Sequence, residues 1–145
     1  MEPAEATTSQ PPALVVDAAN VVGSRPDGWW TDRKGATLTL RNHLAVLARE
    51  GLAWPDAGPN GPRVSPHIVL VAEGQARGLD SADGVEVVDA AGRGDDEIVD
   101  TVRRLLAEAP ARPVVVATAD RELRSRVQAL GAAVMSARAV RHPAE

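Results

Sequence analysis

The amino-acid sequence predicts a doubly wound α/β domain, in which a mainly parallel five-stranded sheet carries helices on both of its faces. Short apolar runs rich in Val alternate along the chain with longer stretches whose Leu, Ile and Val residues recur at helical spacing. This alternation of strand and helix is typical of a parallel sheet with right-handed crossovers. The chain has 145 residues, 44% of them hydrophobic, which is enough to form one hydrophobic core. Two separate cores are not expected at this length.

The first half of the domain is predicted to contain two strands and one helix. Apolar runs with β-branched residues, each ending at an acidic residue, predict the strands, and a stripe of Leu40, Leu44 and Leu47 ended by Gly51 predicts the helix. A segment rich in Pro and Gly breaks both kinds of structure and predicts a surface loop. In order, these elements are a strand at 13–16, a loop at 23–32, a helix at 36–50, the surface loop at 52–66 and a strand at 67–72.

The second half is predicted to contain three strands and two helices. Ile98, Val102 and Leu105 form a helical stripe that ends before Pro110, and a later helix is closed by Gly131. In order, the elements are a short crossover at 74–84, a strand at 85–90, a helix at 95–108, a strand at 113–118, a helix at 121–130 and a strand at 132–135. The domain is predicted to span 13–136, between a disordered N-terminal tail at 1–12 and a polar C-terminal tail at 137–145.

Acidic residues follow four of the predicted strands. The carboxyl ends of parallel strands meet at one edge of an open sheet, where such folds bind their ligands. Each acid alone has an ordinary explanation, because carboxylates at the start of a helix cap free N–H groups. Together, however, they repel one another unless a cation compensates them. These acids are Asp17, Glu73, Asp95, Asp96 and Asp120.

The sequence therefore predicts an all-oxygen metal site at this edge of the sheet. The chain has no Cys, and its three His residues, His43, His67 and His142, show no ligand spacing. Carboxylate oxygens suit Mg²⁺ or Mn²⁺ better than Zn²⁺.

Three short motifs lie at this edge in a characteristic order: Asp-Ala-Ala-Asn at 17–20, Gly-Arg-Gly-Asp-Asp at 92–96 and Thr-Ala-Asp-Arg at 118–121. Together they resemble the NYN branch of the PIN-like ribonucleases, and most closely its bacterial YacP-like group. The resemblance covers nearly the whole predicted fold. It implies a sheet order of 3-2-1-4-5, which places Asp17 beside Asp120. The chain differs from the commonest NYN pattern in having Ala18-Ala19 where a Gly and an aromatic residue are frequent, and Glu73 where Asp is often found.

The resemblance also implies an activity and a role for each residue. It implies that one or two Mg²⁺ or Mn²⁺ ions activate a water that hydrolyses RNA, leaving 5'-phosphates and 3'-hydroxyls. Asp17, Asp96 and Asp120 are the implied metal-binding and catalytic acids. Asp95 and Glu73 are the implied supporting metal ligands, and Asn20 is an orienting or substrate-contacting residue.

Contacts to RNA are expected from basic, aromatic and hydroxyl side chains near this edge. A Trp in the loop after the first strand is suited to stacking on an unpaired base, and Thr118 is also expected to hydrogen-bond among the acids. Solvation at the surface explains the basic residues equally well. The expected contacts are Asn20, Arg25, Trp29, Arg33, Lys34, Thr118 and Arg121.

Two other functions remain open from the sequence. One is a catalytically weak RNA-binding or scaffold module of the same fold. The other is a metal-dependent phosphohydrolase of small molecules, which is less favoured because Ala19 stands where haloacid-dehalogenase-like enzymes have a second Asp. A net charge of −4 argues against broad electrostatic binding of nucleic acid, but it is compatible with an enzyme that binds a phosphodiester through metal ions and a local basic patch. With no signal segment and no membrane span, a cytoplasmic protein is expected, and a homodimer is compatible with the sequence.

Overall fold

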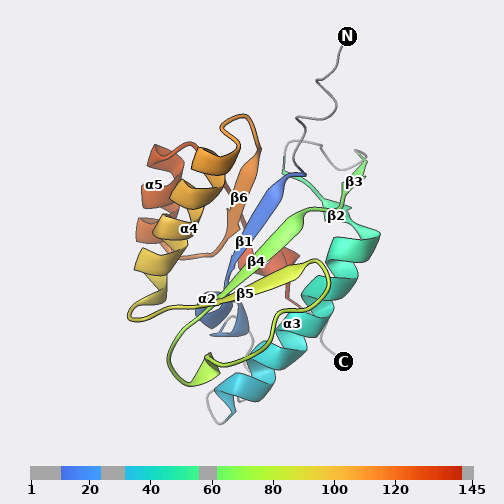
Figure 1. Cartoon of the computed structure of the whole chain (residues 1–145), viewed down its shortest axis with the longest axis vertical. Coiled ribbons are helices and arrows are strands. Elements are labelled where there is room, and N and C mark those ends of the chain that lie inside the picture. Colours follow the sequence, from blue (N-terminus) through green and yellow to red (C-terminus); the bar gives the residue numbers. More distant parts are fainter. Residues whose placement is uncertain (1–10, 24–31, 56–61, 142–145) are drawn as a thin grey trace.

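The computed structural model describes residues 11–23, 32–55 and 62–141. Their centre is a five-stranded parallel sheet with the order β5-β4-β1-β6-β7 (Figure 1). This confirms the predicted fold class and the predicted order 3-2-1-4-5. The strands are β1 (Ala13–Asp17), β4 (His67–Ala72), β5 (Val85–Asp89), β6 (Val114–Ala117) and β7 (Ala133–Met135).

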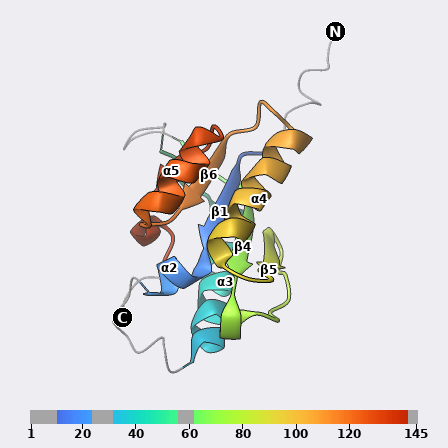
Figure 2. The same ribbon diagram turned by 90° about the vertical axis from the view of Figure 1, so that its left-hand side faces the viewer.

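Helices cover both faces of the sheet, and side chains that alternate along β1 separate two apolar layers. Leu14 and Val16 pack with α2 and α3, whereas Ala13 and Val15 pack with α4 and α5. Figure 2 shows α4 and α5 side by side in front of the sheet, with α3 behind it. Every residue of β1 is buried, as expected for a central parallel strand. The helices are α2 (Ala18–Gly23), α3 (Arg33–Glu50), α4 (Gly94–Glu108) and α5 (Arg121–Ala129).

Most of the predicted elements are confirmed to within one or two residues. The helix predicted at 36–50 begins earlier, at Arg33, because the Asp32 side chain accepts a hydrogen bond from the Gly35 backbone N–H at 2.9 Å and caps the helix. The crossover at 74–84 contains only one short 3₁₀ turn, η2 (Gly74–Ala76). No helix among the described residues is both long and apolar enough to cross a membrane.

Three predictions from the sequence were wrong. The six-residue helix α2 was not expected. The segment predicted as a surface loop contains an antiparallel pair, β2 (Leu52–Ala53) and β3 (Arg63–Val64), and buries Leu52 and Trp54 in the core.

The C-terminal tail predicted at 137–145 is the third error. Ala137 and Val140 are buried against the layer that contains α2, in and just after the 3₁₀ turn η3 (Ala137–Ala139). The packed domain therefore extends to Val140 rather than to 136. Most of the predicted N-terminal tail lies outside the described residues, but Pro12 already accepts a hydrogen bond from the His67 N–H at 2.9 Å.

Candidate active site

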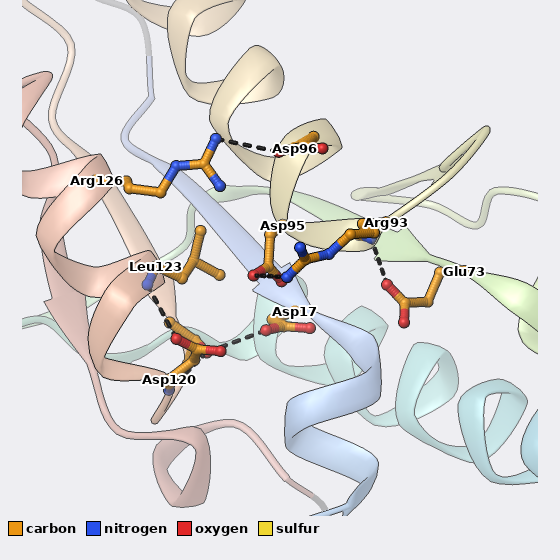
Figure 3. Close-up of polar contacts among 10 residues, drawn as sticks. Asp17, Glu73, Arg93, Asp95, Asp96, Asp120, Leu123 and Arg126 are labelled. Carbon is orange, nitrogen blue, oxygen red and sulfur yellow. Dashed lines mark hydrogen bonds and ion pairs between the residues drawn. The ribbon is translucent and has the colours of Figure 1, made fainter.

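The acidic residues gather at the carboxyl edge of the sheet, around the end of its central strand. Asp17 is the last residue of β1, between β4 and β6. Glu73 follows β4, Asp95 and Asp96 lie in the first turn of α4, and Asp120 directly precedes α5. Figure 3 shows Asp17 between Glu73, Asp95 and Asp120. The fold therefore brings together acids that are more than 100 positions apart in the sequence.

Asp17 is the buried centre of this group, with only 7% of its surface exposed. Its Oδ2 accepts a hydrogen bond from the Thr118 hydroxyl at 3.0 Å, and its Oδ1 accepts one from the Asn20 backbone N–H at 3.3 Å. The pKa of Asp17 is raised from 3.8 to about 6, mainly by burial and to a smaller extent by the charges of Asp95 and Glu73, while the two hydrogen bonds oppose the rise. The neighbouring guanidinium groups of Arg93 and Arg126 pair with Asp95 and Asp96 rather than with Asp17, so the charge of Asp17 is suited to compensation by a bound cation.

Asp95 and Asp96 point in different directions, although they are neighbours in the sequence. In Figure 3 the Asp95 carboxylate is directed toward Asp17, while Asp96 is directed toward Arg126 on α5. The Asp96 side chain is 68% exposed and lies 3.1 Å from the Arg126 guanidinium, whereas that of Asp95 is 21% exposed and lies 3.5 Å from Arg93. The structure thus directs Asp95 toward Asp17 (Figure 3), whereas the resemblance implied Asp96 as the main metal-binding acid of this pair.

Glu73 fixes the start of α4. Its Oε1 accepts a hydrogen bond from the Gly94 backbone N–H, one of the N–H groups that the helix itself leaves unpaired. A Cβ built on Gly94 would collide with that carboxylate, so the second Gly of the Gly-Arg-Gly-Asp-Asp motif is required for this contact. Glu73 therefore positions Asp95 in addition to adding its own charge near Asp17.

Asp120, Thr118 and Asn20 connect the other side of the site. The Asp120 Oδ1 accepts from the Leu123 N–H at 3.0 Å and caps α5, while its own N–H donates to the Thr118 hydroxyl at 3.1 Å. The Asn20 Oδ1 accepts from the Ala119 N–H at 2.8 Å, which joins α2 to the turn after β6. The prediction that Thr118 hydrogen-bonds among the acids is confirmed.

Thr118 is fully buried beside Asp17, so it has no exposed surface with which to make the predicted contact to substrate. The Asn20 side-chain oxygen is likewise engaged by the backbone. Both residues hold other groups of the site in place.

The acids match a divalent metal in donor type but not in spacing. All the donors are carboxylate oxygens, which Mg²⁺ and Mn²⁺ prefer. Within the described ranges, no three acidic or His side chains lie close enough together to hold an ion as they stand. Mg²⁺ commonly takes only one or two carboxylates and completes its shell with water and substrate phosphate. Asp17 and Asp95 are the pair that fits such a site.

The basic residues predicted to contact RNA are only partly placed by the structure. Arg33 and Lys34 are exposed in the first turn of α3, and Arg121 is exposed at the start of α5. Arg25 and Trp29 lie outside the described residues. Sequence reasoning overlooked Arg93 and Arg126, which form ion pairs with Asp95 and Asp96. The position of Arg93 inside the second motif, two residues before Asp95, could have indicated that it lies near the acids.

Comparisons with known proteins agree with this fold. No protein-family model and no curated protein matches the sequence. The crystal structure of a single-residue variant of Rae1 (YacP) from Bacillus subtilis is similar, with a TM-score of 0.65 and 19% identity over 89% of this chain and 72% of that one. The crystal structure of Rae1 (YacP) without that change gives a TM-score of 0.60 and 18% identity over 88% and 70%.

The chain therefore shares the α/β fold of Rae1 (YacP). This confirms, at the level of the fold, the resemblance to the YacP-like group that three short motifs indicated. Identity below 20% leaves the chemistry to be argued from the residues of this chain.

Proposed function

From the fold that the chain shares with Rae1 (YacP), we propose that it hydrolyses RNA phosphodiester bonds with Mg²⁺ or Mn²⁺ at the carboxyl edge of the sheet. The observation that carries this proposal is the buried Asp17 carboxylate, which lies near the charges of Asp95 and Glu73 and has its pKa raised to about 6. Such an arrangement is costly without a cation and is characteristic of sites that use one.

Asp17 and Asp95 are the residues that would hold the ion. When bound, a divalent ion polarises the phosphodiester and makes an attacking water more acidic. Thr118 and the Asn20 backbone N–H orient the Asp17 carboxylate, and the contact between Glu73 and Gly94 fixes the start of the helix that carries Asp95. The bond that caps α5 uses only the Oδ1 of Asp120. The Oδ2 of the same carboxylate is therefore suited to accepting a proton from water.

Positive side chains around the acids would offset the charge of the substrate. Arg93 is paired with Asp95 and 78% exposed, so it is free to turn toward a phosphate once a cation takes its place. Arg121 is exposed beside Asp120. The attack of water is expected to leave a 5'-phosphate and a 3'-hydroxyl.

A second candidate is an RNA-binding module of the same fold with little activity. Its support is that Glu73, Asp96 and Asp120 already engage Gly94, Arg126 and Leu123, and that no three acids of the described residues are close enough to hold a metal. In that case the acids serve mainly to cap helices and join elements.

Cleavage of 5'-labelled single-stranded and structured RNAs in MnCl₂, MgCl₂ or EDTA separates the two candidates. The wild type is expected to cut only with metal, and Asp17→Asn is expected to lower the rate by about a hundredfold or more. Asp100→Asn is the matched control, because Asp100 lies on the exposed side of α4 and pairs with Arg103. RNA binding without metal-dependent cleavage of any substrate would favour the binding module.

A further inference from the structure

A small cavity lies next to the acids, on the side of the sheet covered by α3. Its volume is about 260 Å³, and it is enclosed by α2, the first turns of α3 and the turn η2 after β4. Helix α3 packs against both α2 and η2, and Figure 1 shows η2 and α2 near the N-terminal end of α3. Glu73 belongs both to the wall of the cavity and to the acids whose charge acts on Asp17. A ligand in the cavity would therefore lie beside the proposed cleavage site.

The wall of the cavity combines apolar side chains with hydrogen-bond acceptors. Ala19, Val22 and Ala76 supply the apolar part. Glu73 has one oxygen engaged by Gly94 and a second available, and the Thr37 hydroxyl donates to the Arg33 carbonyl at 2.8 Å while keeping its own acceptor sites. Every RNA base has a flat face and at least one N–H donor on its Watson–Crick edge, so this lining matches an unpaired base.

The size of the cavity restricts the ligand to one such base. Cavities that hold drug-sized molecules measure roughly 300–1,000 Å³, and this one is smaller. A duplex end or a peptide helix does not fit within it. Arg33 also belongs to the wall, and a guanidinium is the kind of planar group on which bases stack.

The positively charged side chains of Arg77 and Lys34 lie beside the cavity, where the phosphate next to a bound base would be placed. Arg77 folds back so that its Nε donates to the Gly74 carbonyl at 3.3 Å. The Lys34 amine lies close to Gly78, 3.1 Å from the position that a Cβ on that glycine would take. A neutral base belongs in the cavity and a phosphate belongs among these cations, because the acids on the other side repel it.

We propose that this cavity receives one unpaired base of single-stranded RNA, next to the bond to be cut, while Arg77 and Lys34 contact the neighbouring phosphate. The inference rests on the proposed function and adds to it a requirement for an unpaired nucleotide at one fixed position. RNA that is fully base-paired at that position would be a poor substrate, because its base cannot leave the stack without a cost.

The test is a series of single-stranded RNAs that differ only in which nucleotide lacks its base. Dissociation constants are measured by fluorescence anisotropy in EDTA, so that no strand is cut, and the cleavage site is mapped separately with metal. We expect removal of the base at one position to weaken binding to the wild type about tenfold, and removal elsewhere to have little effect. This part requires no variant protein.

A variant that fills the cavity tests whether the loss of affinity on removal of the base arises at this cavity. Ala19→Leu adds a side chain to the wall from an exposed position of α2, and Ala107→Leu makes the same change on an exposed position of α4, remote from the cavity. Ala19→Leu is expected to bind intact RNA about tenfold more weakly and to lose its sensitivity to the critical base. Ala107→Leu should behave as the wild type.

The possible outcomes distinguish this inference from the function on which it rests. If the wild type binds and cuts RNA but tolerates a missing base at every position, or if Ala19→Leu keeps the full sensitivity, the cavity does not hold a base while the nuclease function stands. If the wild type neither binds nor cuts RNA, the proposed function fails, and the inference fails with it.

Discussion

Asp17 is the residue in which stability and the proposed function conflict. Its carboxylate is buried, orders Thr118 and α2 through hydrogen bonds, and has a pKa of about 6 instead of 3.8. Because the folded state binds this proton more tightly than the unfolded state, the contribution of Asp17 to stability is complete below about pH 4 and is lost as the pH rises through 6. A shift of this size corresponds to about 3 kcal/mol.

We therefore expect Asp17→Asn to be more stable than the wild type at neutral and alkaline pH without metal. The predicted gain in the free energy of unfolding is about 1–3 kcal/mol at pH 8, and it should shrink toward zero near pH 4. Urea denaturation in EDTA at both pH values measures it. Asp100→Asn, at an exposed position, should change the stability by less than about 0.5 kcal/mol at either pH.

Added metal extends this experiment. A divalent ion that binds only the folded protein stabilises it, and the stabilisation grows with the logarithm of the ion concentration once that exceeds the dissociation constant. MgCl₂ or MnCl₂ should therefore raise the stability of the wild type at pH 8 and leave that of Asp17→Asn unchanged. Equal stabilisation of both proteins would place the ion elsewhere.

At the scale of the element, α4 decides which of two adjacent acids faces Asp17. Consecutive residues of a helix point about 100° apart, so Asp95 and Asp96 cannot both face β1. We predict that Asp95→Asn lowers RNA cleavage by about a hundredfold, whereas Asp96→Asn, which breaks only the ion pair with Arg126, stays within about threefold of the wild type. Single-turnover cleavage rates provide the measurement. The opposite ranking would restore the assignment that the motif implied.

The same helix shows which features could be predicted from the sequence and which could not. The apolar runs at β1, β4 and β6 are strong signals, because a strand buried on both faces needs nearly continuous apolar residues. The choice between Asp95 and Asp96 depends instead on where the first turn of α4 begins. That point is fixed by a contact between Gly94 and Glu73, 21 residues earlier, which no local pattern contains.

The missed elements were too short to carry a periodic signal. Helix α2 has six residues, and it is capped by Asp17, whose Oδ1 accepts from the Asn20 N–H. Six residues are too few to show a helical period in the sequence. Strands β2 and β3 have two residues each, within a segment whose Pro and Gly content predicts a loop. Each is defined by tertiary packing against the core.

At the scale of the whole molecule, the C-terminal segment closes the layer that contains α2 and α3. Val140 is fully buried and Ala137 nearly so. Truncation after Ser136 should therefore lower the free energy of unfolding by about 2 kcal/mol or more, the value of burying one Val together with an Ala. Truncation after Arg141, which removes only residues outside the described ranges, is the reference protein in the same urea titration. Equal stability of the two truncated proteins would show that the segment does not support the core.

The hydrogen bond between Thr118 and Asp17 also indicates when the acidic site can form during synthesis of the chain. It joins residues 101 positions apart, across the pairing of β1 with β6. A ribosome releases Asp17 early, but β1 acquires its second neighbour only after β6 has emerged. A nascent chain that lacks β6 therefore has neither the paired Asp17 nor Asp120, and the acidic centre forms only when nearly the whole domain has been translated.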